Sequence, residues 1–146
     1  MSHLEAALQQ AQLAVRVDEV PIGAVIVKDG IVISAAHNLT ETRNDPTAHA
    51  EMLAIRAACE SLGQKYLSEC DLYVTLEPCA MCAQAISLAK IRRVYFGAYD
   101  PKGGGVEHGA RVFSQTTCHH KPEVYGGMME NECGELLKRF FEERRF

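Results

Sequence analysis

The chain has 146 residues, of which 47% are hydrophobic and 23% are charged, and its formal net charge is −4. This length is typical of one globular domain with a substantial core, so we expect a single domain over residues 1–146. No apolar run approaches the roughly 18 residues that a membrane span needs, and the first residues do not resemble a signal peptide. We therefore expect a cytoplasmic protein without a membrane span. The acidic balance argues against nucleic-acid coating by global charge but allows a local basic patch.

Hydrophobic periodicity and turn-forming residues predict alternating helices and strands. A hairpin is indicated by the turn signal Lys28-Asp29-Gly30 between two β-rich runs. The expected elements are a helix over 4–17, strands over 22–27 and 31–35, a helix over 47–62, a strand over 71–78, a helix over 80–89, a strand over 92–98, a short strand within 122–127 and a closing helix over 131–145. A hairpin followed by strand–helix–strand crossovers predicts an α/β fold, a three-layer α/β/α sandwich whose mixed sheet has about five strands.

The stretch "DPTAHAEM" precedes the second expected helix and allows two interpretations. Asp45 is a typical N-cap, Pro46 is typical of a first helical turn, and an acidic residue suits the positive end of a helix. In that interpretation His49 is structural or solvated. Alternatively, His49 is a metal ligand and Glu51 is its acid/base partner. These eight residues do not decide between the two.

The stretch "EPCAMC" provides a partner for His49. The six cysteines do not suggest a disulfide framework, and only Cys79 and Cys82 lie close together, at metal-ligand spacing. Positions i and i+3 share a helical face, and the positive end of a helix favours thiolate. A redox pair is the alternative, but such a pair needs no histidine. One imidazole and two thiolates suit Zn²⁺ and leave a fourth position open for water, as catalytic zinc sites do.

Glu51 is not needed as a ligand in this arrangement. Two residues beyond His49, its carboxylate can reach a water on the metal, whose pKa zinc lowers towards ~7. The carboxylate can take a proton from this water and deliver it to a ring nitrogen and a leaving amine. The residues therefore predict hydrolytic deamination of an amidine-like carbon.

The motifs His49-Ala50-Glu51 and Pro78-Cys79-Ala80-Met81-Cys82 match the H-x-E and P-C-x-x-C signature of zinc-dependent nucleobase deaminases. With "VPIGAVIV", "RRVYFGAYDPKGG" and "NECGELLKRFFEERR", nearly the whole chain resembles the bacterial tRNA-specific adenosine deaminases. The resemblance implies a cytidine deaminase-like fold and a homodimer with one Zn²⁺ per chain. It also implies conversion of the wobble adenosine of a tRNA anticodon to inosine.

The resemblance assigns roles to individual residues. Zinc ligation falls to His49, Cys79 and Cys82, and proton transfer falls to Glu51. Substrate contacts are implied for Asn38, for the backbone of Ile22, Gly23 and Ala24, for Asp100, and for Phe141 and Arg144 of the closing helix. The alternatives are plain structural roles: a turn at Asn38 or Asp100, and core packing or a dimer contact for the closing-helix phenylalanines.

Two other functions and one departure from the family pattern stay open. A deaminase of free guanine or cytidine would carry the same signature, and a non-catalytic zinc scaffold would be expected to lose Glu51. The glycine-rich loop, residues 99–112, lacks the serine and the small-residue spacing of the resembled family, which leaves the tRNA isoacceptor and sequence context undetermined. Cations expected to gather at an RNA-binding mouth are Lys102, Lys121, Lys138, Arg139, Arg144 and Arg145.

Overall fold

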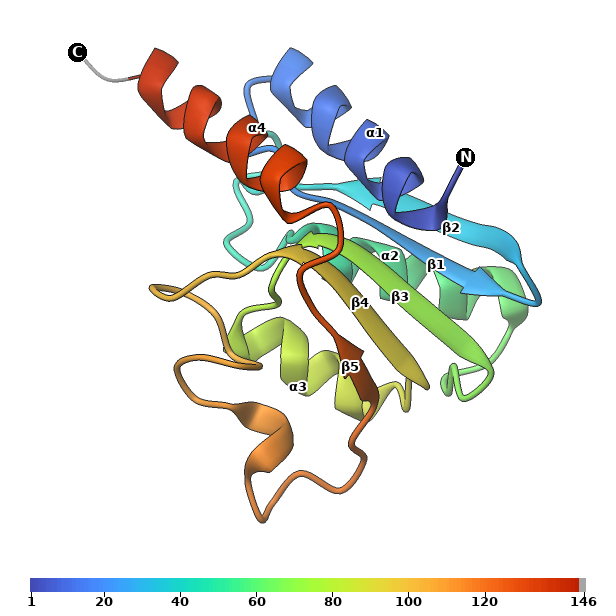
Figure 1. Ribbon diagram of the computed structural model, residues 1–146. Helices are drawn as coiled ribbons and strands as arrows, with labels where there is room; N and C mark the ends of the chain where they lie inside the picture. The colour runs from blue at the N-terminus through green and yellow to red at the C-terminus, as the bar shows by residue number, and fades with distance from the viewer. Residues whose placement is uncertain (145–146) are drawn as a thin grey trace.

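A five-stranded sheet lies between two layers of helices in the computed structural model, which describes residues 1–144 (Figure 1). The elements are α1 (His3–Arg16), β1 (Gly23–Lys28), β2 (Ile31–His37), α2 (Ala50–Leu62), β3 (Cys70–Leu76), α3 (Ala80–Leu88), β4 (Arg93–Ala98), the short 3₁₀ helix η1 (Val112–Ser114), β5 (Glu123–Tyr125) and α4 (Glu130–Glu143). Helices α1 and α4 lie on one face of the sheet, and α2 and α3 lie on the other. The predicted three-layer α/β/α fold is confirmed.

The strand order is β2-β1-β3-β4-β5, with an antiparallel half and a parallel half. Strand β1 pairs antiparallel with β2 and β3, whereas β3, β4 and β5 run parallel. Both Asp29 and Gly30 have positive φ, 52° and 75°, as the tight turn of a right-twisted hairpin requires. Helix α3 makes the crossover between β3 and β4, so the segment after β3 begins at the carboxyl edge of the parallel strands. The expected short fifth strand is β5, at the edge of the sheet.

The second helix begins later than the sequence predicted. Asp45 does not cap α2: its Oδ1 accepts hydrogen bonds from the backbone N–H and the hydroxyl of Thr47, at 2.9 and 2.7 Å, and closes a separate turn. His49, with φ −74° and ψ 151°, is the N-cap residue, and Ala50 is the first helical residue. The prediction for Asp45 and Pro46 was wrong because the Asp side chain bonds a residue two positions on, which competes with helix capping.

Helix α1 packs on the sheet through small side chains. Ala7, Ala11 and Ala14 are fully buried, and a Cβ on Gly23 at the start of β1 would lie 2.0 Å from the carbonyl oxygen of Ala7. The backbones of α1 and β1 therefore approach more closely than any other residue at position 23 would permit. In residues 1–144 no helix has both the length and the apolar character that a membrane crossing requires.

We expect Gly23→Ala to lower the free energy of unfolding by about 1–3 kcal/mol, the usual cost of overpacking. The added methyl group would meet the backbone of α1, which cannot rotate away. Urea unfolding measures the change. Gly134→Ala in α4 is the matched control: its new Cβ would have its nearest neighbour at 4.0 Å, and alanine is the better helix former. Equal destabilisation of both variants would contradict the close approach of α1 and β1.

Candidate active site

The three predicted metal ligands all lie at helix starts on one face of the sheet. His49 is the N-cap residue of α2, Cys79 is the N-cap residue of α3, and Cys82 lies in the first turn of α3. Neither N-cap side chain bonds its own helix, so its polar atom is available to another partner. Because α2 and α3 cover the same face of the sheet, the fold brings residues about thirty positions apart to one point (Figure 1).

The spacing of these atoms fits a tetrahedral zinc ion. His49 Nδ1 lies 3.6 Å from the Sγ of Cys79 and 3.5 Å from the Sγ of Cys82, and the three ligand atoms all lie within 4.8 Å of one another. Zinc–nitrogen and zinc–sulfur bonds of ~2.0–2.1 and ~2.3 Å at tetrahedral angles separate nitrogen from sulfur by about 3.6 Å. The donor set therefore has both the chemistry and the dimensions of a zinc site, and Nδ1 is the histidine nitrogen that faces it.

The two thiols differ in acidity because one donates to the other. A hydrogen bond from the Cys82 thiol, assisted by one from His49, lowers the pKa of Cys79 to about 4 against the opposing effect of burial. The same contact raises the pKa of the donor, Cys82, and burial adds to that effect. Cys79 is thus a thiolate at neutral pH, which is the form that binds a metal.

Glu51 is the second residue of α2 and is almost completely buried, with 4% of its surface exposed. Burial raises the pKa of its carboxyl to about 7, and the neighbouring Cys79 thiolate acts in the same direction. A carboxyl group with a pKa near neutrality can both accept and donate a proton at working pH. The position and environment of Glu51 suit a proton carrier.

Asn38 follows β2 and is held next to the ligand helix. Its backbone N–H donates to the carbonyl of Ile22 at 3.1 Å, and the next residue, Leu39, donates to the carbonyl of Ala48 at 3.0 Å, directly before His49. The Asn38 side chain is buried, and among the described residues its Oδ1 has no hydrogen-bond partner. Because buried polar atoms are normally satisfied, this oxygen is suited to accept a hydrogen bond from a bound molecule.

The three residues expected to line a base pocket lie in different surroundings. Ala24 is fully buried in the main core, on the side of α2 and α3, and Ile22 packs against that core. Gly23 faces α1, and its N–H donates to the Thr75 hydroxyl at 3.1 Å. Of the three, Ile22 is the one whose carbonyl accepts a hydrogen bond from Asn38.

Glu77 is a site residue that the sequence reasoning did not single out. It is fully buried two residues before Cys79, and its carboxylate accepts hydrogen bonds from the glycine-rich loop. Burial alone would raise the pKa of Glu77, but the N–H groups of the loop outweigh it and hold the pKa below its usual range. No local pattern reveals this role, because the donors lie more than twenty residues away in sequence.

Two of the remaining predicted contacts, Asp100 and Phe141, line a cavity of about 560 Å³ between the glycine-rich loop and α4. Its lining includes Val20, Tyr99, Asp100, Lys102, Leu137 and Phe141. Phe141 is 51% exposed, so its ring is not a core residue. Asp100 Oδ1 accepts from the N–H of Lys102 at 3.2 Å, as in an Asx turn, and also from the N–H of Gly103 at 2.9 Å. Arg144 instead pairs with Asp18 and lies over the ring of Phe140, 3.7 Å from its centroid.

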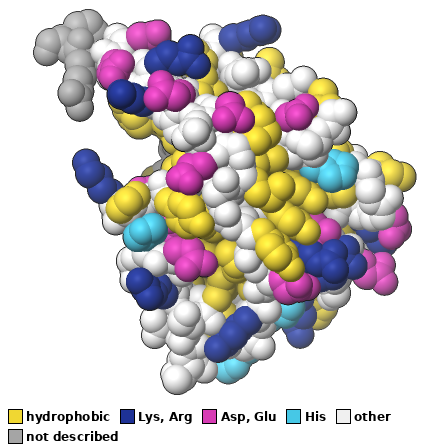
Figure 2. All heavy atoms as spheres, viewed as in Figure 1, with side chains coloured by type: hydrophobic (Ala, Val, Ile, Leu, Met, Phe, Trp, Pro, Cys, Tyr) yellow, Lys and Arg dark blue, Asp and Glu magenta, His cyan; other side chains and the backbone are white. Residues whose placement is uncertain are grey.

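The expected basic residues do not all gather at this cavity. Lys121 lies just before β5, whose first residue pairs with Arg93 at the start of β4, whereas Cys79 and Cys82 follow the carboxyl end of β3. Lys121 therefore lies at the amino ends of the parallel strands, opposite the carboxyl ends where these cysteines lie. Its predicted place at the RNA-binding mouth was wrong. Arg145 lies outside the described residues. Figure 2 shows basic and acidic side chains interspersed over the visible face.

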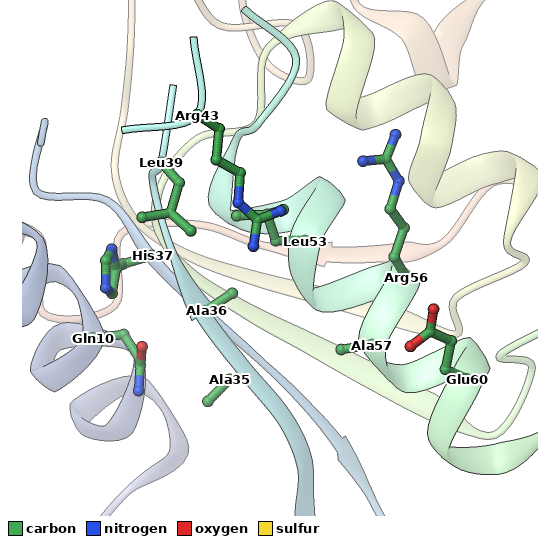
Figure 3. A pocket seen from close by; sticks show the side chains of 10 residues that line it. All are labelled: Gln10, Ala35, Ala36, His37, Leu39, Arg43, Leu53, Arg56, Ala57 and Glu60. Carbon is green, nitrogen blue, oxygen red and sulfur yellow. The ribbon is translucent and has the colours of Figure 1, made fainter. Parts of the chain in front are cut away.

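A second hollow, of about 440 Å³, lies over β2 and the outer side of α2 (Figure 3). The side chains of Arg43, from the loop after β2, and Arg56, from α2, extend over it. None of the three metal ligands lines this hollow. Arg43 and Arg56 were not among the basic residues that the sequence predicted for RNA binding.

The mixed sheet and the His-Cys-Cys group with its buried glutamate define a deaminase of the cytidine deaminase-like class. The chain belongs to the MafB19-like deaminase family, whose model matches residues 2–145. Within that class it belongs with the tRNA-specific adenosine deaminases. It is 61% identical over 142 residues to the tRNA-specific adenosine deaminase of Agrobacterium fabrum (strain C58 / ATCC 33970), across 97% of this chain and 93% of that relative.

Solved structures show the same relationship. A chain described in biochemical and structural studies of A-to-I editing by tRNA:A34 deaminases at the wobble position of transfer RNA superposes with a TM-score of 0.91. It is 61% identical, and the match covers 92% of this chain and 98% of that one. Guanine deaminase from Bacillus subtilis is more distant, with 34% identity and a TM-score of 0.66 over 100% and 96% of the two chains.

Proposed function

We propose that the chain catalyses the hydrolytic deamination of adenosine to inosine at the wobble position of a tRNA anticodon. The observation that carries the proposal is the group of His49, Cys79 and Cys82 beside the buried Glu51, within a chain that is 61% identical to a tRNA-specific adenosine deaminase. The reaction consumes one water, replaces the exocyclic amine of the base by an oxygen and releases ammonia.

The proposed cofactor is one Zn²⁺ per chain, held by His49 Nδ1 and the sulfurs of Cys79 and Cys82, and when bound it would supply an activated water and a Lewis acid. Glu51 carries both protons of the attacking water: it takes the first and delivers it to the ring nitrogen, and it then takes the second from the newly attached hydroxyl group and delivers it to the departing amine. Its burial excludes bulk water from these transfers. We propose that Asn38 Oδ1, which has no partner within residues 1–144, accepts a hydrogen bond from the bound nucleoside.

The cavity beside the glycine-rich loop is the proposed place for the nucleotides that flank the target. Extruding a base from an anticodon loop costs ~a few kcal/mol, which contacts to neighbouring nucleotides can offset. Phe141 offers an exposed ring for stacking, and Lys102 offers a cation for phosphate. Arg144 would have to leave Asp18 before its guanidinium could contact RNA.

The decisive test is direct. The purified chain is incubated with a tRNA that carries adenosine at the wobble position, and the digested RNA is analysed for inosine by mass spectrometry. Guanine and cytidine are assayed in parallel for ammonia release. Inosine at the wobble position supports the proposal. Ammonia from guanine or cytidine without inosine from tRNA would show a deaminase of free bases or nucleosides instead.

We expect RNA affinity to depend on salt through Lys102. Two or three phosphate contacts predict a fall of about ten- to fortyfold in affinity for an anticodon stem-loop between 50 and 200 mM salt. Lys102→Gln should reduce the log–log salt slope by about 1. Lys121→Gln, at the opposite edge of the sheet, is the matched control and should leave the slope unchanged. Fluorescence anisotropy measures both, and a flat salt dependence in the unmodified protein would contradict the RNA-binding surface.

Phe141→Ala should raise the KM for the stem-loop by about tenfold, the usual effect of losing one base–aromatic stack. Because the side chain is 51% exposed, the melting temperature should hardly change. Phe141→Tyr keeps a ring and should retain most of the affinity. If Phe141→Ala lowers stability and leaves KM unchanged, the ring has a packing role and does not stack on RNA.

We also propose that the active form is a homodimer and that it works in the cytoplasm, where its tRNA substrate resides. Ile31 on the edge strand β2 and Leu88 at the end of α3 are large apolar side chains with 66% and 67% of their surface exposed. We propose them as candidate contacts between two chains. Light scattering after gel filtration should give a mass near twice the 16.1 kDa of one chain.

A further inference from the structure

One buried carboxylate holds the glycine-rich loop at two places, its start and its middle. Glu77 accepts hydrogen bonds through both oxygens, and no part of its side chain is exposed to solvent. Oε1 accepts from the backbone N–H of Asp100 at 3.0 Å and lies 2.8 Å from His108 Nδ1, and Oε2 accepts from the N–H groups of Val106, Glu107 and His108 at 3.2, 2.9 and 3.1 Å. Four backbone donors and one side chain of the loop thus converge on a single group.

The loop is also pressed against the helix start that carries the metal ligands. The N–H of Gly105 donates to the carbonyl of Pro78 at 2.8 Å, and a Cβ on Gly105 would lie 2.5 Å from the backbone nitrogen of Ala80. A Cβ on Gly104 would lie 2.5 Å from Oε2 of Glu77. Glycines at these two positions permit the loop to wrap around the carboxylate. Glu77 consequently lies between the start of α3 and the loop, in contact with both.

The loop forms one wall of the cavity of about 560 Å³ whose lining includes Phe141. Asp100, the first residue held by Glu77, and Lys102, between the held positions, are among the lining residues. A buried carboxylate is costly unless fully hydrogen-bonded, and an apolar side chain would fill the same volume without that cost. A carboxylate, in contrast, can accept hydrogen bonds from several N–H groups of one loop and thereby order them together.

We propose that Glu77, with the His108 side chain, is a positioning residue that fixes the glycine-rich loop as a wall of the RNA-binding cavity and thereby sets affinity for the RNA substrate. This inference rests on the proposed function for the identity of the substrate. None of the hydrogen bonds that the Glu77 carboxylate accepts comes from His49, Cys79 or Cys82. Loss of the Glu77 contacts should therefore act on KM, with kcat and metal content largely retained.

The test uses Glu77→Gln, which keeps the size of the side chain but replaces one acceptor oxygen by an NH₂ group that faces backbone donors. We expect KM for the anticodon stem-loop to rise by about tenfold, the usual effect of losing hydrogen bonds to a charged group. Zinc content should stay near one per chain. Trypsin should cut after Lys102, between the held positions, and after Arg111, just beyond them, about tenfold faster than in the unmodified protein.

His108→Ala removes only the side-chain contact and should give a smaller change in the same direction. His108 has 34% of its side chain exposed, so this variant remains informative if Glu77→Gln fails to fold. Glu60→Gln, an exposed glutamate on α2, is the matched control and should change none of the readouts. Trypsin cleavage needs no RNA, so the loop-holding role is measured even where no inosine is formed.

Three outcomes decide the matter. Faster cleavage in the loop with raised KM and retained zinc supports the proposal. Unchanged cleavage rates in both variants overturn it, because the loop would then be ordered without Glu77. Loss of zinc or a fall in kcat at unchanged KM also overturns it, since Glu77 would then support the metal ligands. Absence of inosine with the unmodified protein contradicts the proposed function separately.

Discussion

Glu51→Gln should lower kcat for inosine formation by about 10²–10⁴-fold, the usual contribution of general acid/base catalysis. Glutamine has nearly the same shape and can still hydrogen-bond, but it cannot take a proton from water or deliver one to the leaving amine. KM should change little, because no substrate contact is removed. Inosine in digested tRNA, quantified by mass spectrometry over a time course, measures the loss.

The matched control is Glu60→Gln, on the same helix but exposed to solvent. It should retain full activity. Both variants should keep their zinc, since neither carboxylate is among the ligand atoms. Full activity of Glu51→Gln would remove the proton carrier from the proposed mechanism. A Glu51→Gln protein that had lost its metal would show that the carboxylate supports the site and not the chemistry.

Cys82→Ser should abolish metal binding and activity together. Losing an outer partner of a metal ligand already costs about 10- to 100-fold in metal affinity, so losing a ligand should cost more. Elemental analysis should fall from near one zinc per chain to a small fraction of that. A metal that binds only the folded chain stabilises it, so a chelator should lower the melting temperature of the unmodified protein and leave that of Cys82→Ser unchanged.

Cys59→Ser separates ligand loss from the general effect of removing a thiol. Cys59 lies on α2, is only partly buried and is not among the clustered ligand atoms. This variant should keep its metal, its activity and its response to the chelator. Normal zinc content in Cys82→Ser would contradict the three-ligand site.

Local sequence patterns were sufficient to predict most of the helices and strands and the class of reaction. The turn at Asp29-Gly30 and the glycine after α2 lie where the sequence predicted them, because both need a positive φ that glycine and aspartate tolerate. The H-x-E and P-C-x-x-C spacings bring ligands to one helix face or one helix start, which is local geometry. The start of α2 could not be located in this way, because an Asp side chain can either cap a helix or bond the residue two positions on, and Asp45 bonds Thr47.

The sequence by itself determined the layered α/β architecture, and it was sufficient to propose the donor set of a metal site and the acid/base residue, since each depends on residue type and spacing within one or two elements. Only the tertiary structure decided which residues surround the proposed site. It removed Lys121 from the predicted RNA mouth, turned Gly23 towards α1 and left Asn38 Oδ1 without a partner among the described residues. It also joined Glu77 to a loop more than twenty residues away. These contacts follow from strand order and loop closure, which no local spacing encodes.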